Sequence, residues 1–230
     1  MTMHASNLAA LAAIAAALPG CDGKPSPGSA VSAAMSAGAA STGTPALPEN
    51  IALVSAFESD LHTPFGNDWR PVNDQAGGGV STAQAELVAG GANGTAHALR
   101  VHGKVTVGDY LFPMGGIGLP LGAVRDHMPS PVDIARYSGV EFWVKGDGKR
   151  YMLRVMDDDV KDFNFHHYPF TTTPDWQLVR LRFTDLKQFD WGQRVAWTGR
   201  TVSAFLFTNY SPPGEDFGDF EFFVDEISFF

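Results

Sequence analysis

The chain has 230 residues, of which 44 % are hydrophobic and 12 % aromatic, and its formal net charge at pH 7 is −9. This apolar content is sufficient for one sizeable core. The acidic balance and the absence of any run of Lys and Arg exclude a nucleic-acid ligand, because neutralising phosphates requires clustered basic residues. The single cysteine, Cys21, excludes an internal disulfide.

The first twenty residues form an Ala- and Leu-rich segment, MTMHASNLAALAAIAAALPG, that ends directly before Cys21. Residues 1–20 resemble a bacterial lipoprotein signal peptide, although their first part has His4 and no Lys or Arg. The resemblance implies cleavage before Cys21 and lipidation of this cysteine, and an ordinary secretory signal is the alternative. Either signal predicts a location in the bacterial cell envelope, in the periplasm or at the surface. With lipidation, the lipid anchor is expected to be the only contact with the membrane.

Residues 21–50 are rich in Pro, Ser, Ala and Gly and have no periodic apolar face, which predicts a flexible, disordered linker. A flexible coil of this length has a root-mean-square span of about 30 Å. The domain predicted for residues 51–230 would therefore stand clear of the membrane surface.

From residue 51 onward, segments rich in Val, Phe, Trp, Tyr and Leu recur between turn signals, without a long stripe at the helical period. This pattern predicts strands over residues 51–57, 94–107, 139–145, 150–156, 166–170, 177–183, 203–210 and 220–230. Many short strands without an alternation of strands and helices predict an all-β fold with two stacked antiparallel sheets in one domain.

The clearest alternation runs through residues 139–145 and 150–156. Apolar residues at every second position are predicted to face the core, namely Val140, Phe142, Val144, Tyr151, Leu153 and Val155. Between the two segments, Gly146-Asp147-Gly148 supplies the positive φ that a tight turn requires, and we predict a hairpin here.

Two short motifs carry a family resemblance. Residues 69–74 and 78–81 read WRPVND and GGVS, and residues 145–151 read KGDGKRY. They resemble two signatures of the complex I intermediate-associated protein 30 family, and Trp176 and residues 222–227 are similar to its later strands.

The resemblance covers residues 52–229 and implies a galactose-binding-like jelly roll, similar to family 11 carbohydrate-binding modules. The chain departs from the family at residues 108–122, where GDYLFPMGGIGLPLG replaces a Gly-Gly-Phe segment. Assembly of a mitochondrial complex is not carried over to an exported chain. The resemblance implies the fold and a tendency to bind.

In the resembling modules, sugars lie on a concave sheet face against aromatic rings, carboxylates and amides. The resemblance implies Trp191 and Tyr210 as the stacking rings, and Tyr110 and Trp197 are weaker candidates in loops. It implies contacts to sugar hydroxyls by further residues near strand ends, namely Asp157, Asp159, Asp190, Asn209, Arg154 and His167. The alternatives are rings folded over the edge of the core and a solvated acidic loop at residues 157–159.

Two metal sites can be considered. A transition-metal site from His166, His167 and an aspartate conflicts with strand geometry, since adjacent residues point to opposite faces. The first and last strands pair in the resembling modules, which implies a structural Ca²⁺ site from Glu58, Asp60 and Asp225. The alternative is that Asp225 caps backbone amides. No other cofactor is indicated.

Enzymatic motifs are missing from the sequence. It contains no GxSxG, no HExxH and no cysteine that could act as a nucleophile. We therefore predict a non-catalytic, lipid-anchored binding module whose partner is a carbohydrate or an envelope polysaccharide. The alternative is an envelope protein-interaction or complex-assembly factor that uses the same fold.

Overall fold

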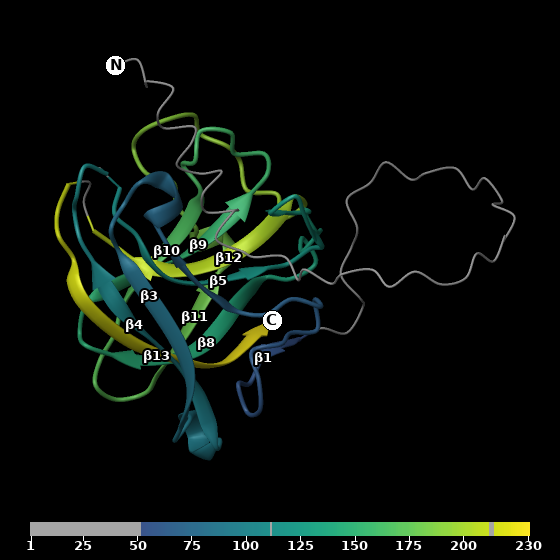
Figure 1. Ribbon diagram of the computed structural model, residues 1–230. Coiled ribbons are helices and arrows are strands. Elements are labelled where there is room, and N and C mark those ends of the chain that lie inside the picture. The colour runs from purple at the N-terminus through teal and green to yellow at the C-terminus, as the bar shows by residue number, and fades with distance from the viewer. Residues whose placement is uncertain (1–51, 111, 212–213) are drawn as a thin grey trace, which may run out of the picture.

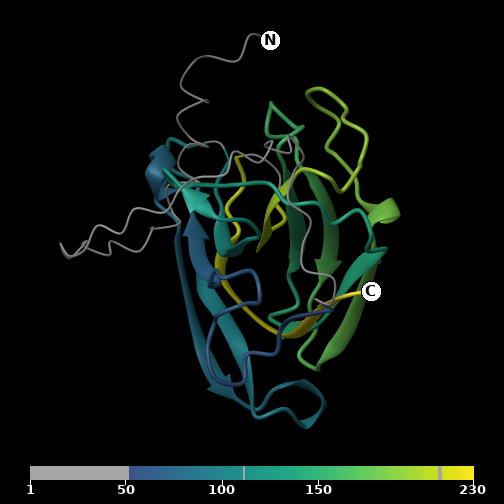
Figure 2. The same cartoon turned by 90° about the vertical axis from the view of Figure 1, so that its right-hand side faces the viewer.

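The computed structural model describes residues 52–110, 112–211 and 214–230. These residues form two antiparallel sheets stacked as two layers (Figures 1 and 2). The predicted signal peptide, the linker and Cys21 lie outside the described residues. Within the described part, no helix has both the length and the apolar character needed to cross a bilayer.

The first sheet has the strand order β11-β8-β13-β4-β3, and β1 also pairs with β13. Its strands are β1 (Leu53–Ser55), β3 (Thr82–Ala89), β4 (His97–Val105), β8 (Gly139–Gly146), β11 (Gln177–Arg182) and β13 (Gly218–Phe229). In Figure 1 the yellow strand β13 curves along this sheet, and the β3–β4 pair extends beyond the sandwich.

The second sheet has the order β10-β9-β12-β5-β2. Its strands are β2 (Arg70–Asn73), β5 (Gly115–Pro120), β9 (Arg150–Asp157), β10 (His166–Thr171) and β12 (Val202–Asn209). The remaining elements are a small ribbon of β6 (Val124–Arg125) and β7 (Met128–Pro129) and the 3₁₀ turns η1 (Gln75–Gly77), η2 (Ala92–Gly94) and η3 (Phe183–Asp185). The predicted all-β sandwich of two sheets is confirmed.

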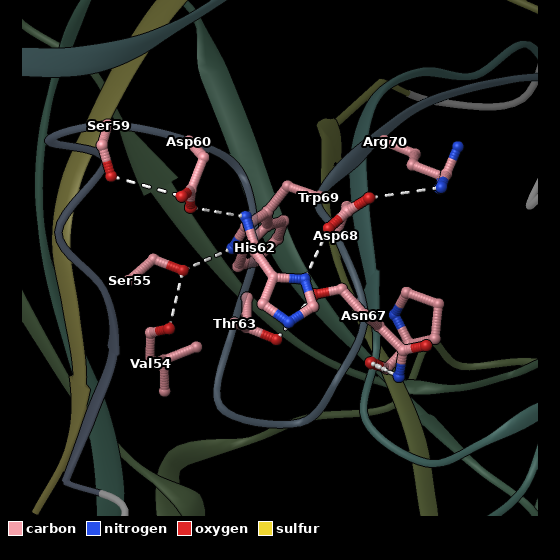
Figure 3. A network of polar contacts seen from close by, with 11 residues as sticks. Val54, Ser55, Ser59, Asp60, His62, Thr63, Asn67, Asp68, Trp69 and Arg70 are labelled. Carbon is pink, nitrogen blue, oxygen red and sulfur yellow. Dashed lines mark hydrogen bonds and ion pairs between the residues drawn. The ribbon is translucent and has the colours of Figure 1, made fainter.

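Aromatic rings from both sheets fill the space between them. Phe142 of β8 meets Phe207 of β12 edge to face, with ring centroids 4.8 Å apart and an interplanar angle of 81°. Such pairs add about 0.5–1.5 kcal/mol beyond the burial of area. Trp69 of the WRPVND motif is 1 % exposed, and its indole N–H donates to Ser55 Oγ at 2.7 Å (Figure 3). The motif's tryptophan is therefore a core residue.

The loop between β1 and β2 is held by a polar network (Figure 3). His62 Nδ1 lies 2.8 Å from Asp68 Oδ1, and the His62 amide donates to Asp60 Oδ1 at 3.0 Å. Asn67 Nδ2 donates to the carbonyls of Pro120 and Gly122, both at 3.0 Å. The exposed contact between His62 and Asp68 contributes little to stability. The two hydrogen bonds of Asn67 fasten this loop to the end of β5.

The predicted hairpin around Asp147 is wrong. Strand β8 lies in the first sheet between β11 and β13, whereas β9 lies in the second sheet between β10 and β12, so the turn crosses from one layer to the other. The alternation correctly identified the buried faces, since Phe142 and Leu153 are both fully buried. The two faces pack against the same core from opposite sheets. Alternation of side chains therefore does not indicate which strand pairs with which.

The Asp147 carboxylate stabilises this crossing. It accepts hydrogen bonds from the Tyr151 hydroxyl at 2.9 Å, the Lys149 amide at 3.0 Å and the Glu221 amide at 3.2 Å. Gly148 has φ +83°, as the turn requires. Burial, followed by the charge of Asp147, raises the pKa of Tyr151, which therefore stays a neutral donor.

Strands β2, β3 and β5 were not predicted. The segment GGIGLP of β5 is fully buried in the second sheet between β12 and β2, although its composition is typical of a loop. A Cβ on Gly116 would lie 1.9 Å from the carbonyl oxygen of Phe207, and a Cβ on Gly118 would lie 2.9 Å from Leu206 Cδ2. These glycines allow close approach within the sheet rather than a turn.

Candidate ligand-binding face

The second sheet has an inner face, which packs on the core, and an outer face, which is turned away from the first sheet. On β9 the inner face carries Leu153 and Val155, and the outer face carries Arg154. His167 of β10 and Leu206 of β12 are the register partners of Arg154, one on each side. Because directly opposite residues share a face, these three side chains form one row across the outer face.

Four rings gather beside this row, which we call the aromatic cluster: His167, Phe189, Trp191 and Tyr210. Phe189 stacks on His167 with centroids 4.0 Å apart, and it lies 6.3 Å from Trp191 and 5.9 Å from Tyr210. Trp191 and Tyr210 are both partly exposed. The two rings predicted for stacking thus lie in one cluster, joined by Phe189, which sequence reasoning missed.

Buried Asn164 positions the segment that carries Phe189 and Trp191. Its Oδ1 accepts the Phe189 amide at 2.8 Å, and its Nδ2 donates to the carbonyls of Phe189, at 3.0 Å, and of Trp191. Reciprocal backbone hydrogen bonds of 2.8 and 3.0 Å between His167 and Lys187 tie the same segment to β10. Asn164 lies in no motif, so nothing in the sequence pointed to it.

Arg154 is a partly exposed cation on the outer face. Burial lowers its pKa to about 10, against the opposing effect of Tyr110, so Arg154 remains charged at neutral pH. The Tyr110 hydroxyl is close enough for Arg154 to lower its pKa, although burial and Asp74 raise that pKa overall. Tyr110, predicted as a weaker candidate, therefore lies near the row.

His167 is neutral at pH 7, because burial lowers its pKa to about 4 and the nearby charges of Arg154 and Lys187 add to that shift. Its neighbour His166 faces inward, with its ring centroid 5.4 Å from that of Trp197. The two histidines point to opposite faces, as predicted. Trp197 also packs against Phe183, with ring centroids 5.1 Å apart.

Four predicted contact residues lie apart from the cluster or are engaged elsewhere. Asp157 is fully buried, and its Oδ1 accepts Thr201 Oγ1 at 2.7 Å and the Asp159 amide at 3.0 Å. Asp159 itself is exposed, in agreement with the alternative of a solvated loop. Asp190 is fully exposed and pairs with Arg194 at 2.6 Å.

Asn209 supports the chain rather than facing outward. It is 4 % exposed, its Oδ1 accepts the Gly115 amide at 3.1 Å, and its Nδ2 donates to the Pro113 carbonyl at 3.1 Å. The structure therefore places Trp191, Tyr210 and Arg154, all partly exposed, on or beside the outer face. His167 lies on that face too, but it is 3 % exposed and Phe189 stacks on it. The structure assigns Asn209, like Asp157, to internal hydrogen bonds.

Residues 113–115 are fastened across this region by Asp74. Asp74 Oδ2 accepts the Met114 amide at 2.9 Å and Ser81 Oγ at 2.6 Å, while Oδ1 accepts the Ser81 amide at 2.9 Å. These bonds connect the last residue of the WRPVND motif, Asp74, to the last residue of the GGVS motif, Ser81. Met114 packs with Val72 and Leu206, so residues 108–122 supply part of the outer face as well as β5.

Two of the predicted calcium ligands, Glu58 and Asp225, contact the same loop at residues 92–96, whereas Asp60 accepts the His62 amide. Asp225 Oδ2 accepts the Ala92 amide at 2.8 Å and Thr95 Oγ1 at 2.7 Å, and Oδ1 accepts the Glu226 amide at 2.8 Å. Asp225 thus caps chain groups, as the alternative proposed, and a calcium site, which takes six to eight oxygen ligands, stays a prediction. Across the described residues, no three His, Cys, Asp or Glu side chains are grouped to hold a metal.

The two-sheet sandwich is similar in fold to family 11 carbohydrate-binding modules. The family 11 carbohydrate-binding module of cellulosomal cellulase Lic26A-Cel5E of Clostridium thermocellum is 16 % identical, with a TM-score of 0.55 over 78 % of this chain and 94 % of that one. A family 11 module from the same organism, solved with a β-1,3-1,4-mixed-linked tetrasaccharide, is 17 % identical, with a TM-score of 0.53 over 77 % of this chain and 94 % of that one.

Sequence comparisons extend this relationship. Endoglucanase 3 of Fibrobacter succinogenes is 27 % identical over 171 residues, which is 70 % of this chain but only 25 % of the endoglucanase. The model of the complex I intermediate-associated protein 30 family matches residues 57–208. This match spans more than half of the sequence, so the chain belongs to the complex I intermediate-associated protein 30 family.

Proposed function

We propose that the chain is a non-catalytic carbohydrate-binding module that holds a saccharide against the aromatic cluster. The observation that carries the proposal is the joint position of Trp191 and Tyr210, partly exposed and linked through Phe189 beside the outer face. A tetrasaccharide bound to a protein of the same fold supports this choice of ligand.

The chemistry of the cluster suits a sugar. The C–H faces of a pyranose are apolar, and tryptophan and tyrosine offer them a large apolar surface with a polar edge. Arg150 lies over the Tyr210 ring, with 4.3 Å between its Cζ and the ring centroid, and limits the orientations of that ring. Asn164 holds the Trp191 backbone through its carbonyl, which fixes the segment that carries the Trp191 ring.

The affinity of such a site should be modest. Stacking on partly exposed rings with a few hydrogen bonds corresponds to about −8 kcal/mol at best, which is a Kd of about 1 μM. Calorimetric titration against β-glucans, galactans and envelope polysaccharides tests the proposal directly. Heat of binding with at least one saccharide is expected, and no response across the panel would contradict it.

We also propose that the module is displayed in the cell envelope on a lipid attached to Cys21. The apolar segment before this cysteine and the small residues next to it support the proposal. In a bacterial host, the wild-type chain should incorporate an alkyne-tagged palmitate and enter the membrane fraction, and Cys21→Ser should abolish both. Equal labelling of Cys21→Ser would contradict lipidation, since the chain has no second cysteine.

A further inference from the structure

Arg154 has an unusual environment for a cation. Among the described residues, its guanidinium makes one weak polar contact, from Nη2 to Met152 Sδ at 3.9 Å. No carboxylate of the described residues forms an ion pair with it. Arg70, Arg100, Arg180 and Arg194 each have one, and other arginines without one, such as Arg150 and Arg182, are exposed, whereas Arg154 is partly buried. A partly buried charge usually gains a partner, because desolvation otherwise costs free energy.

The neighbours of Arg154 are also basic or neutral. His167, its partner on β10, is affected by the positive charges of both Arg154 and Lys187. Arg150 lies on the same strand, over the Tyr210 ring. This local excess of positive charge occurs in a chain whose net charge is −9. Asp74, whose charge acts on neighbouring Tyr110, is buried and already accepts three hydrogen bonds.

We propose that the saccharide bound at the aromatic cluster carries an anionic substituent, a carboxylate or a sulfate, which Arg154 holds. This inference rests on the proposed function. The planar guanidinium donates two parallel hydrogen bonds to either group, which is a geometry that a lysine does not offer. The rings would stack on the sugar while Arg154 selects its charge.

The net negative charge of the chain opposes this selection only weakly. Charges further than about 8 Å from the substituent are largely screened at physiological ionic strength. The contact with Arg154 is short and partly desolvated, so screening reduces it much less. The local contact therefore outweighs the distant repulsion.

The test compares an acidic sugar with its neutral ester, with a sulfated sugar and with an acidic peptide. Trigalacturonate, its methyl ester, a sulfated galactose trisaccharide and triglutamate are titrated by calorimetry into the full chain. A charge-assisted hydrogen bond is worth about 1.5–3 kcal/mol, so trigalacturonate or the sulfated sugar should bind at least about tenfold tighter than the ester. The tighter of the two identifies the substituent.

Variants assign the preference to its residue. Arg154→Met should bind the acid and the ester with equal affinity while keeping the ester affinity of the wild type, and Arg154→Lys should keep part of the preference. Arg182→Met removes one positive charge from β11 of the other sheet and should leave the preference intact. Thermal unfolding confirms that each variant is folded.

The results separate two failures. If the wild type binds the ester as tightly as the acid and sulfate, or Arg154→Met keeps the preference, this inference is overturned and the proposed function stands. If no saccharide binds, the proposed function fails and the inference fails with it. Triglutamate binding as tightly as trigalacturonate would indicate an acidic peptide as the partner and also overturn the inference.

Discussion

Gly116→Ala is expected to lower the free energy of unfolding by about 3 kcal/mol or more. The new methyl group would lie 1.9 Å from the Phe207 carbonyl oxygen, and backbone on the partner strand cannot move aside as a flexible side chain can. Overpacking of a core costs about 1–3 kcal/mol when side chains adjust, and here β5 and β12 must separate. Urea denaturation followed by tryptophan fluorescence measures the change.

Gly108→Ala is the matched control for this substitution. Its methyl group would meet Val80 Cγ2 at 3.4 Å, which is an ordinary contact at an exposed position. The control should change stability by less than about 0.5 kcal/mol. Equal stability of Gly116→Ala and the wild type would show that β5 is not packed closely against β12 in the second sheet.

Trp191→Ala is expected to weaken saccharide binding about 30-fold. Removing a central aromatic contact from a binding site typically costs about 2 kcal/mol, which corresponds to this factor. The side chain is partly exposed and stacks on Phe189 alone among the described rings, so its removal should leave the core intact. The measurement is a calorimetric titration with the tightest-binding saccharide of the panel.

Trp176→Ala provides the comparison. Trp176 is partly exposed just before β11 of the first sheet, 4.8 Å from Lys145 Nζ, and should not affect the ligand. If the two variants lose affinity equally, or if Trp191→Ala binds as the wild type does, the aromatic cluster is not the site.

The all-β class and the buried faces of β8 and β9 could be predicted, because alternation of side chains follows directly from strand geometry. The partners of those strands could not be predicted, since Phe142 and Leu153 face the same core from different sheets. Strand β5 was missed for a related reason. Its glycines are required by close contacts with Phe207 and Leu206, which are distant in sequence. The composition of a segment does not indicate such contacts.

The positions of some candidate site residues could be predicted, because those residues lie near the ends of predicted strands. Trp191, Tyr210, His167 and Arg154 lie on or beside the outer face, and their contact with a ligand stays a prediction. Asp157 and Asn209 were expected there too, yet both occupy inner positions and bond the chain itself. A carboxylate or amide in a sequence does not reveal whether it serves a ligand or the backbone. That distinction appears only when its hydrogen-bond partners are known.

The indole N–H signals of the five tryptophans provide the most direct test of where a saccharide binds. In a ¹⁵N-labelled sample titrated with the tightest-binding saccharide, the Trp191 signal should shift in proportion to occupancy. The signals of Trp143 and Trp176, on the first sheet, and of buried Trp69 should stay in place. Shifts at Trp143 or Trp176 with an unchanged Trp191 signal would contradict a binding site at the aromatic cluster.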